Sequence, residues 1–264
     1  MDFLIQWRHA VSALALASLV ACGGGGGGSA TSGVGTGTGT VANPGSSSGA
    51  ADVSTAQGFW SGPVDAQTSA SVIVLPDGST WVVLQSATTL NNLARGTATL
   101  SNANAFSVSG RSYNLATGVV SSAGLSGILV PKASLSVAAT SNSPAYTLTY
   151  NKAYETPAKL ADVAGRWSAT RGAGAVQLSL DISASGALTG SSSTACTYAG
   201  TLTPHANAIA VFNLSLTETC LGTPAQTYSG IATTNTATNG LSMAFTTADQ
   251  ATGSAIQATR VPVP

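Results

Sequence analysis

The stretch Val176-Gln177-Leu178-Ser179-Leu180-Asp181-Ile182 alternates apolar and polar side chains along its whole length. Residues 145–150 and 211–216 alternate in the same way. Successive side chains of a strand point to opposite faces of a sheet, so this period of two predicts strands with one buried face. No stretch after the N-terminal region has the spacing of an amphipathic helix. We therefore predict an all-β fold.

Turn-forming segments separate the expected strands at the roughly 8–12-residue spacing typical of all-β domains. Gly, Pro, Asn and Asp favour tight turns because they tolerate or preset the required backbone angles. The segments are Pro76-Asp77-Gly78, residues 101–104, residues 141–144, Ser185-Gly186, residues 204–207 and Thr238-Asn239-Gly240. Short strands joined in this way predict an antiparallel meander.

The chain also contains an internal repeat. Gly58-Phe59-Trp60-Ser61 returns 107 positions later as Gly165-Arg166-Trp167-Ser168. Five further matched segments follow in the same order at offsets of 103 to 108, beginning at Val72 and Leu180, Gly96 and Gly200, Phe106 and Phe212, Leu125 and Tyr228, and Leu135 and Leu241. Six matches in one order predict a duplication. We expect two tandem antiparallel meander lobes of about eight strands each, closed as a small barrel or folded as a sandwich.

A Gly-x-Trp pattern stands on the first expected strand of each copy, at Gly58 and Trp60 and at Gly165 and Trp167. This pattern before a barrel-sized meander resembles the lipocalin and avidin families. The resemblance implies that Trp60 and Trp167 plug the floor of each barrel. We interpret both as core residues, with a ligand-lining role as the alternative. Trp81 has no tryptophan counterpart in the second copy and is the better candidate for lining a pocket specific to the first.

The composition excludes several classes of function. The 264 residues include 9 Lys and Arg and 9 Asp and Glu, so the formal net charge is zero and only 7% of residues are charged. A typical soluble domain has roughly 25%. A chain so poor in charge has no basic surface for nucleic acid and no polybasic patch for anionic lipid. No apolar run in the body of the chain reaches the length of about 18 residues needed for a spanning helix.

The N-terminus has the pattern of an export signal. Arg8 and His9 precede an apolar run over residues 10–20, and the run ends in Leu19-Val20-Ala21-Cys22. These four residues resemble the lipobox of bacterial lipoproteins. The resemblance implies a diacylglyceryl group on the thiol of Cys22, cleavage before it, and a lipid bilayer as the partner of the acylated chain. Gly23 stands where inner-membrane members carry Asp, which implies the outer membrane and leaves the face open. An ordinary secretory signal with an incidental cysteine is the alternative.

The segment after the cysteine is rich in Gly, Ser and Thr. Such a composition predicts a flexible tether with a root-mean-square reach of roughly 30 Å. We therefore divide the chain into a signal peptide (residues 1–21), a tether (22–50), a first β-lobe (51–156) and a second β-lobe (157–264).

Cys196 and Cys220 both lie in the second copy, and the turn near residue 208 is midway between them. A hairpin with that turn places the two cysteines opposite each other, which suits a disulfide in an exported protein. Such a bridge would contribute roughly 3–3.5 kcal/mol in the chain-entropy model. The aligned positions of the first copy fall near Asn92 and Asn114, so we expect that copy to fold without a bridge. A two-cysteine metal site is the alternative, but it needs further ligands and we assign none.

Few residues offer catalytic chemistry. His205 is the only histidine after the signal peptide, and no Gly-x-Ser-x-Gly elbow accompanies it. Among the carboxylates, Asp181 and Glu218 lie within expected strands, where a barrel can bring them together, and Arg166 is a candidate partner for either. We assign no catalytic, cofactor-binding or metal-binding residue.

Two hypotheses follow. The first is a lipoprotein of the cell envelope whose duplicated lobes form a non-catalytic binding or structural module. It predicts a lined barrel cavity or an apolar patch between the lobes, for a small apolar ligand or an envelope protein. The second is a hydrolase of envelope glycans, and it predicts a cleft in which Asp181 and Glu218 converge.

Overall fold

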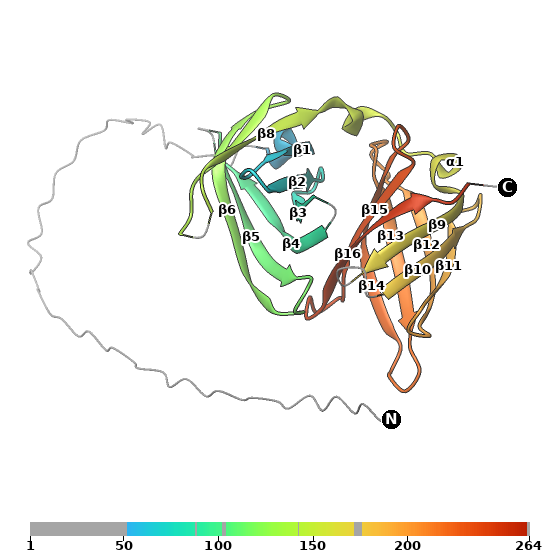
Figure 1. Cartoon of the computed structure of the whole chain (residues 1–264). Helices are drawn as coiled ribbons and strands as arrows, with labels where there is room; N and C mark the ends of the chain where they lie inside the picture. The colour runs from blue at the N-terminus through green and yellow to red at the C-terminus, as the bar shows by residue number, and fades with distance from the viewer. Residues whose placement is uncertain (1–51, 88, 102–103, 142, 172–175, 263–264) are drawn as a thin grey trace, which may run out of the picture. The chain divides into compact units, whose positions relative to one another are not determined.

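The computed structural model describes residues 52–262 except 88, 102–103, 142 and 172–175. The predicted signal peptide, the predicted tether and Cys22 therefore lie outside the described residues. The described part is an all-β fold of sixteen strands in two closed barrels (Figure 1). The first barrel consists of β1 (Gly58–Pro63), β2 (Thr68–Val74), β3 (Ser79–Ser86), β4 (Thr89–Leu100), β5 (Ala105–Asn114), β6 (Val120–Val130), β7 (Ser134–Val137) and β8 (Tyr146–Asn151). The second consists of β9 (Gly165–Arg171), β10 (Val176–Ile182), β11 (Ala187–Ser192), β12 (Thr197–Pro204), β13 (Phe212–Thr219), β14 (Gln226–Asn235), β15 (Gly240–Thr246) and β16 (Gly253–Arg260).

Each barrel is an antiparallel meander whose last strand returns to its first. Trp60 on β1 pairs with Tyr150 on β8, and Trp167 on β9 pairs with Arg260 on β16. These pairings close both sheets, so the lobes are barrels rather than sandwiches.

The six matched segments lie in equivalent strands of the two barrels. The turns that follow β2 and β10 also match in detail. Gly78 and Gly186 adopt positive φ angles of 83° and 84°, a region that favours glycine because it lacks a Cβ. Their carbonyls accept hydrogen bonds of 2.8 Å from the N–H groups of Ala98 and Leu202, respectively. The two copies thus share turn geometry as well as strand order.

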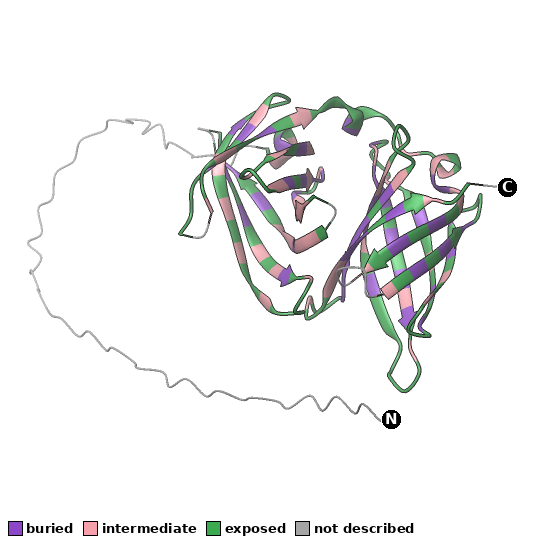
Figure 2. Ribbon diagram, in the orientation of Figure 1, coloured by how far each residue is buried: buried purple, intermediate pink, exposed green. Residues whose placement is uncertain are grey.

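The period-two pattern sorts side chains between the barrel interiors and the outer surfaces (Figure 2). On β10, Leu178, Leu180 and Ile182 are buried, whereas the residues between them are exposed. The interior of the first barrel holds residues such as Val72, Leu135 and Leu148. Each interior is therefore a side-chain core, as expected for a small barrel.

A short helix lies beside the first strand of each barrel. The 3₁₀ helix η1 (Val53–Ala56) precedes β1, and α1 (Leu160–Val163) precedes β9. The Trp60 indole N–H donates to the carbonyl of Ala56 at 3.1 Å, and the Trp167 indole N–H donates to the carbonyl of Val163 at 2.7 Å. Both rings are buried, so each helix is fixed to its barrel through the same side-chain contact.

A further 3₁₀ helix, η2 (Lys152–Glu155), follows β8. None of these helices, in the part of the chain that is described, has the length and hydropathy needed to cross a bilayer.

A third apolar cluster joins the two barrels, which belong to one compact unit of the chain. The first barrel contributes outward-facing residues of β3, β4 and β5, such as Trp81, Leu93 and Tyr113. The second contributes Ile231 of β14 and Ala244 of β15. The outer face of one barrel is thus buried against the outer face of the other (Figure 1).

Candidate functional site

Trp81 is the residue that distinguishes the first barrel from the second. It pairs with Ile73 across β2 and β3, and both side chains point away from the barrel interior toward the inter-barrel cluster. The same register places Thr189 opposite Asp181 in the second barrel, and both of these residues are exposed. An apolar pair in one copy is therefore a polar surface pair in the other. The apolar outer face formed by β2 and β3 is therefore specific to the first copy.

Arg95 connects the two barrels beside Trp81. Its guanidinium lies over the Trp81 ring at 4.9 Å from the centroid, a cation–π geometry. Nη1 also donates a hydrogen bond of 2.5 Å to Oγ1 of Thr246, which is fully buried on β15 of the second barrel. Hydrogen bonds from charged donors are stronger than neutral ones, so Arg95 holds the two faces in register.

Tyr113 makes a second specific contact. Its hydroxyl donates to the carbonyl of Gln250 at 3.0 Å, and its ring lies against Gly253 at the start of β16. A Cβ at position 253 would lie 2.7 Å from the ring, closer than side chains approach. Glycine is required here because the second barrel's backbone packs directly on an aromatic ring.

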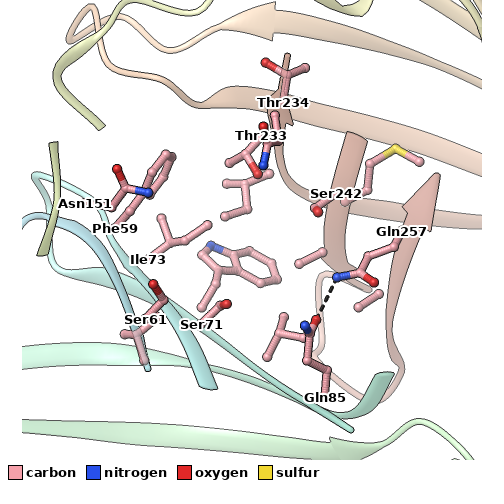
Figure 3. Close-up of a pocket in the computed structure, with 18 of the residues that line it drawn as sticks. Phe59, Ser61, Ser71, Ile73, Gln85, Asn151, Thr233, Thr234, Ser242 and Gln257 are labelled. Carbon is pink, nitrogen blue, oxygen red and sulfur yellow. Dashed lines mark hydrogen bonds between the residues drawn. The ribbon is translucent and has the colours of Figure 1, made fainter. Parts of the chain in front are cut away.

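A groove of about 400 Å³ opens between the barrels next to these contacts (Figure 3). Its apolar surface includes Trp81, Phe59 and Ile73 of the first barrel and Ile231 of the second. Around them lie the polar side chains of Ser61, Ser71, Gln85, Asn151, Thr233, Thr234, Ser242 and Gln257 (Figure 3). Asn235 also lines the groove. The groove thus combines an aromatic and aliphatic surface with amides and hydroxyls from both copies.

One side-chain hydrogen bond crosses the groove. Nε2 of Gln257 on β16 donates to Oε1 of Gln85 on β3 at 2.7 Å (Figure 3). Both amides keep a further donor or acceptor for a ligand, because each amide has two N–H donors and two acceptor lone pairs.

The groove is electrically neutral. None of the described residues that line it has a carboxylate, ammonium, guanidinium or imidazole group. A charged ligand would lose water here without gaining an ionic partner, which is costly. The arrangement therefore favours an uncharged ligand.

A second groove, of about 460 Å³, shares Leu90, Ala255 and Gln257 with the first. Arg171 and Tyr228 lie on its wall, at the end of the second barrel. Unlike the first groove, it therefore has a charged side chain among the described residues that line it, the Arg171 guanidinium.

Glu218 forms a buried polar cluster at this end of the second barrel. Its carboxylate accepts hydrogen bonds from the hydroxyls of Tyr198 at 2.8 Å and Tyr228 at 3.2 Å, and Nη1 of Arg171 lies 3.4 Å away. Burial, followed by the charge of Glu218, raises the pKa of Tyr228 to about 12. The carboxylate is thus satisfied by three partners and serves as a structural acceptor.

The structure does not bring Asp181 and Glu218 together. Asp181 lies on the outer surface of β10, where its side chain is 57% exposed and pairs with Nε of Arg166 at 3.4 Å. Glu218 points into the barrel. The cleft expected for a carboxylate pair is therefore not formed by these two residues, although Arg166 is indeed a partner of one of them.

The predicted disulfide between Cys196 and Cys220 is confirmed. The Cα atoms lie 4.1 Å apart across the β12–β13 hairpin. At the aligned place in the first barrel, Asn92 and Asn114 are cross-strand partners, as the repeat predicts. Glu218 lies near both cysteines, but the bridge occupies the two sulfurs that a metal would need.

Of the remaining predicted residues, Trp60 is among those that line the groove, whereas Trp167 and His205 are not. The rings of Trp60 and Trp167 are inside the barrels, and His205 lies in the connection between β12 and β13. Sequence reasoning missed Gln85, Gln257 and Arg95. The sequence Trp81-Val82-Val83-Leu84 could have indicated the docking face, because a strand that is apolar on both faces is buried on both.

Comparison of the chain with protein-family models, curated proteins and solved structures finds no match.

Proposed function

We propose that this protein is an exported lipoprotein, anchored in the cell envelope through Cys22, whose tandem barrels form a non-catalytic binding module. The observation that carries the binding role is the uncharged groove between the barrels, with Trp81 at its surface. Pockets of about 300–1,000 Å³ with an apolar lining and a few polar groups are typical of ligand sites.

The chemistry of the groove supports binding rather than catalysis. Its polar groups are amides and hydroxyls, which orient a ligand but exchange no proton near neutral pH. The carboxylates considered for hydrolysis lie elsewhere, one on the outer surface and one inside the second barrel. A glycan hydrolase built on Asp181 and Glu218 is therefore disfavoured.

The anchor is supported by the lipobox and by the disulfide. Leu19-Val20-Ala21-Cys22 follows an apolar run of signal-peptide length. A Cys196–Cys220 bridge is typical of oxidising compartments outside the cytosol. Two acyl chains on Cys22 suffice for stable anchoring, since each buried methylene contributes about 0.8 kcal/mol.

Metabolic labelling with a palmitate analogue tests the anchor. In a bacterial host, we expect the wild type to incorporate the label and to fractionate with membranes. Cys22→Ala should do neither. An unlabelled wild-type protein would refute lipidation at Cys22.

A small uncharged probe tests the groove. The full chain in detergent micelles should release or absorb heat on titration with 2-naphthylmethanol. Ser242→Trp should reduce this signal by filling the groove, because Ser242 lines it on β15. Ser168→Trp is the matched control, since Ser168 is exposed on β9 and lies outside the groove. Equal signals in all three proteins reflect partitioning into micelles and contradict the proposed site.

A further inference from the structure

The rim of the groove is made of groups that both donate and accept hydrogen bonds. Four side-chain amides line it, at Gln85, Asn151, Asn235 and Gln257, and hydroxyls lie between them. An amide offers donors on nitrogen and acceptors on oxygen, and a hydroxyl offers one donor and two acceptor lone pairs. The best complement to such a rim is a ligand whose own polar groups also donate and accept. Alcohol hydroxyls have this property.

The surface beneath the rim is apolar. Trp81, Phe59 and Ile73 come from the first barrel, and Ile231 and Ala244 come from the second. A ligand that fits both parts needs an apolar face as well as hydroxyls at its edge. The C–H face and the equatorial hydroxyls of a sugar ring provide this combination.

We propose that this groove binds a neutral oligosaccharide; this inference rests on the binding role proposed above and names its ligand class. The sugar rings lie against the apolar surface around Trp81, and their hydroxyls hydrogen-bond with the amides of the rim. A volume of about 400 Å³ suits a short segment of the chain rather than a polymer.

The uncharged lining of the groove disfavours acidic sugars. Carboxylates and phosphates are bound by Arg, Lys or clusters of N–H groups. Arg95, the nearest guanidinium described above, is engaged with Trp81 and Thr246 instead. A uronic acid or a sulfated sugar placed in the groove would lose hydration without an ionic partner.

In this proposal, the hydrogen bond between Gln85 and Gln257 is replaced by hydrogen bonds to the ligand. The two amides come from different barrels and already hydrogen-bond with each other across the groove at 2.7 Å. A sugar hydroxyl inserted between them accepts from the Gln257 N–H and donates to the Gln85 carbonyl oxygen. The exchange conserves the hydrogen bonds of both amides. These residues therefore determine specificity for hydroxyl-bearing ligands.

Calorimetric titration of the full chain tests the proposal, in micelles of a detergent without a sugar headgroup. The probes are cellotetraose, maltotetraose and triacetylchitotriose, with trigalacturonate as the acidic comparison. We expect saturable binding of at least one neutral probe and at least tenfold weaker binding of trigalacturonate. Gln85→Ala and Gln257→Ala should each weaken the neutral probe by about tenfold. Gln67→Ala is the matched control, because Gln67 is an exposed turn residue outside the groove.

The outcomes separate this inference from the binding role itself. If 2-naphthylmethanol binds in the groove but no neutral sugar does, the sugar assignment is wrong and the binding role stands. If neither binds, both proposals fail. Equal affinity for trigalacturonate, or equal binding by the Gln85→Ala, Gln257→Ala and Gln67→Ala variants, would also overturn the assignment.

Discussion

Single side chains decide how the two barrels meet. Arg95 contacts Trp81 through its guanidinium face and Thr246 through its N–H group, so one residue satisfies partners in both barrels. The position aligned with Arg95 in the second copy is Ala199, which is exposed. The repeat thus kept its interior pattern while its outer positions diverged.

We expect Arg95→Ala to lower the free energy of unfolding by about 1–3 kcal/mol, because Thr246 loses a charged donor and Trp81 loses a cation–π contact. Urea denaturation followed by tryptophan fluorescence measures this change. Arg166→Ala is the control: its ion pair with Asp181 is exposed, and pairs of this kind contribute about 0–1 kcal/mol. Equal losses in the two variants would contradict the role of Arg95.

Alkaline pH should reveal the buried tyrosine beside Glu218. The pKa of Tyr228 is raised to about 12, chiefly by burial, whereas the unfolded residue titrates near the ordinary tyrosine pKa of 10.0. The folded state therefore holds the proton more tightly. The contribution of Tyr228 to stability is complete below pH 10 and declines as the pH rises toward 12. We expect urea midpoints to fall over this window in the wild type and to fall less in Tyr228→Phe. An equal fall of the urea midpoint with pH in the wild type and in Tyr228→Phe would contradict this role of Tyr228.

At the scale of strands, the alternating pattern specified most of the fold. The residues 178, 180 and 182 that the pattern assigned to a buried face do lie inside the second barrel. The hairpin symmetry around residue 208 likewise located the disulfide, because antiparallel register is fixed by the turn. Local sequence patterns are therefore sufficient to predict the buried strand faces and the disulfide.

The groove was not predictable in the same way. Its walls come mainly from β1–β3 and from β14–β16, which are far apart in sequence. Alternation alone assigns Gln85 and Gln257 to an outer surface, and it contains no information about which outer surfaces meet. Only the apolar outer positions, such as Trp81, marked the docking face.

Two isoleucines at matched positions of the repeat offer a direct comparison. Ile231 on β14 is 3% exposed in the inter-barrel cluster, whereas Ile128 on β6 is 52% exposed. We expect Ile231→Ala to lower the free energy of unfolding by about 2–4 kcal/mol through lost burial and a cavity. Ile128→Ala should change it by less than about 0.5 kcal/mol. Chemical denaturation of both variants measures the difference. Similar effects would show that the outer face of β14 is not buried between the barrels.

At the scale of the whole molecule, the inter-barrel cluster should make the two barrels unfold together. The cluster contains buried aromatic and aliphatic residues from both barrels, so undocking or unfolding one barrel removes packing from the other. We expect one thermal transition by calorimetry in the wild type. Gly253→Leu should separate it into two, because a side chain at this position collides with the Tyr113 ring. Two transitions in the wild type would refute this coupling.

The position of the groove has an evolutionary consequence. An ancestor encoding one barrel could not have formed this enclosed space, since residues of both copies are needed to form it. If the groove has the proposed binding role and the repeat arose by duplication, selection on ligand recognition acted after the duplication. Such selection predicts different changes on the outer faces of the two copies. Positions 73 and 81 of the first copy are aliphatic and aromatic, whereas their counterparts 181 and 189 in the second copy are polar.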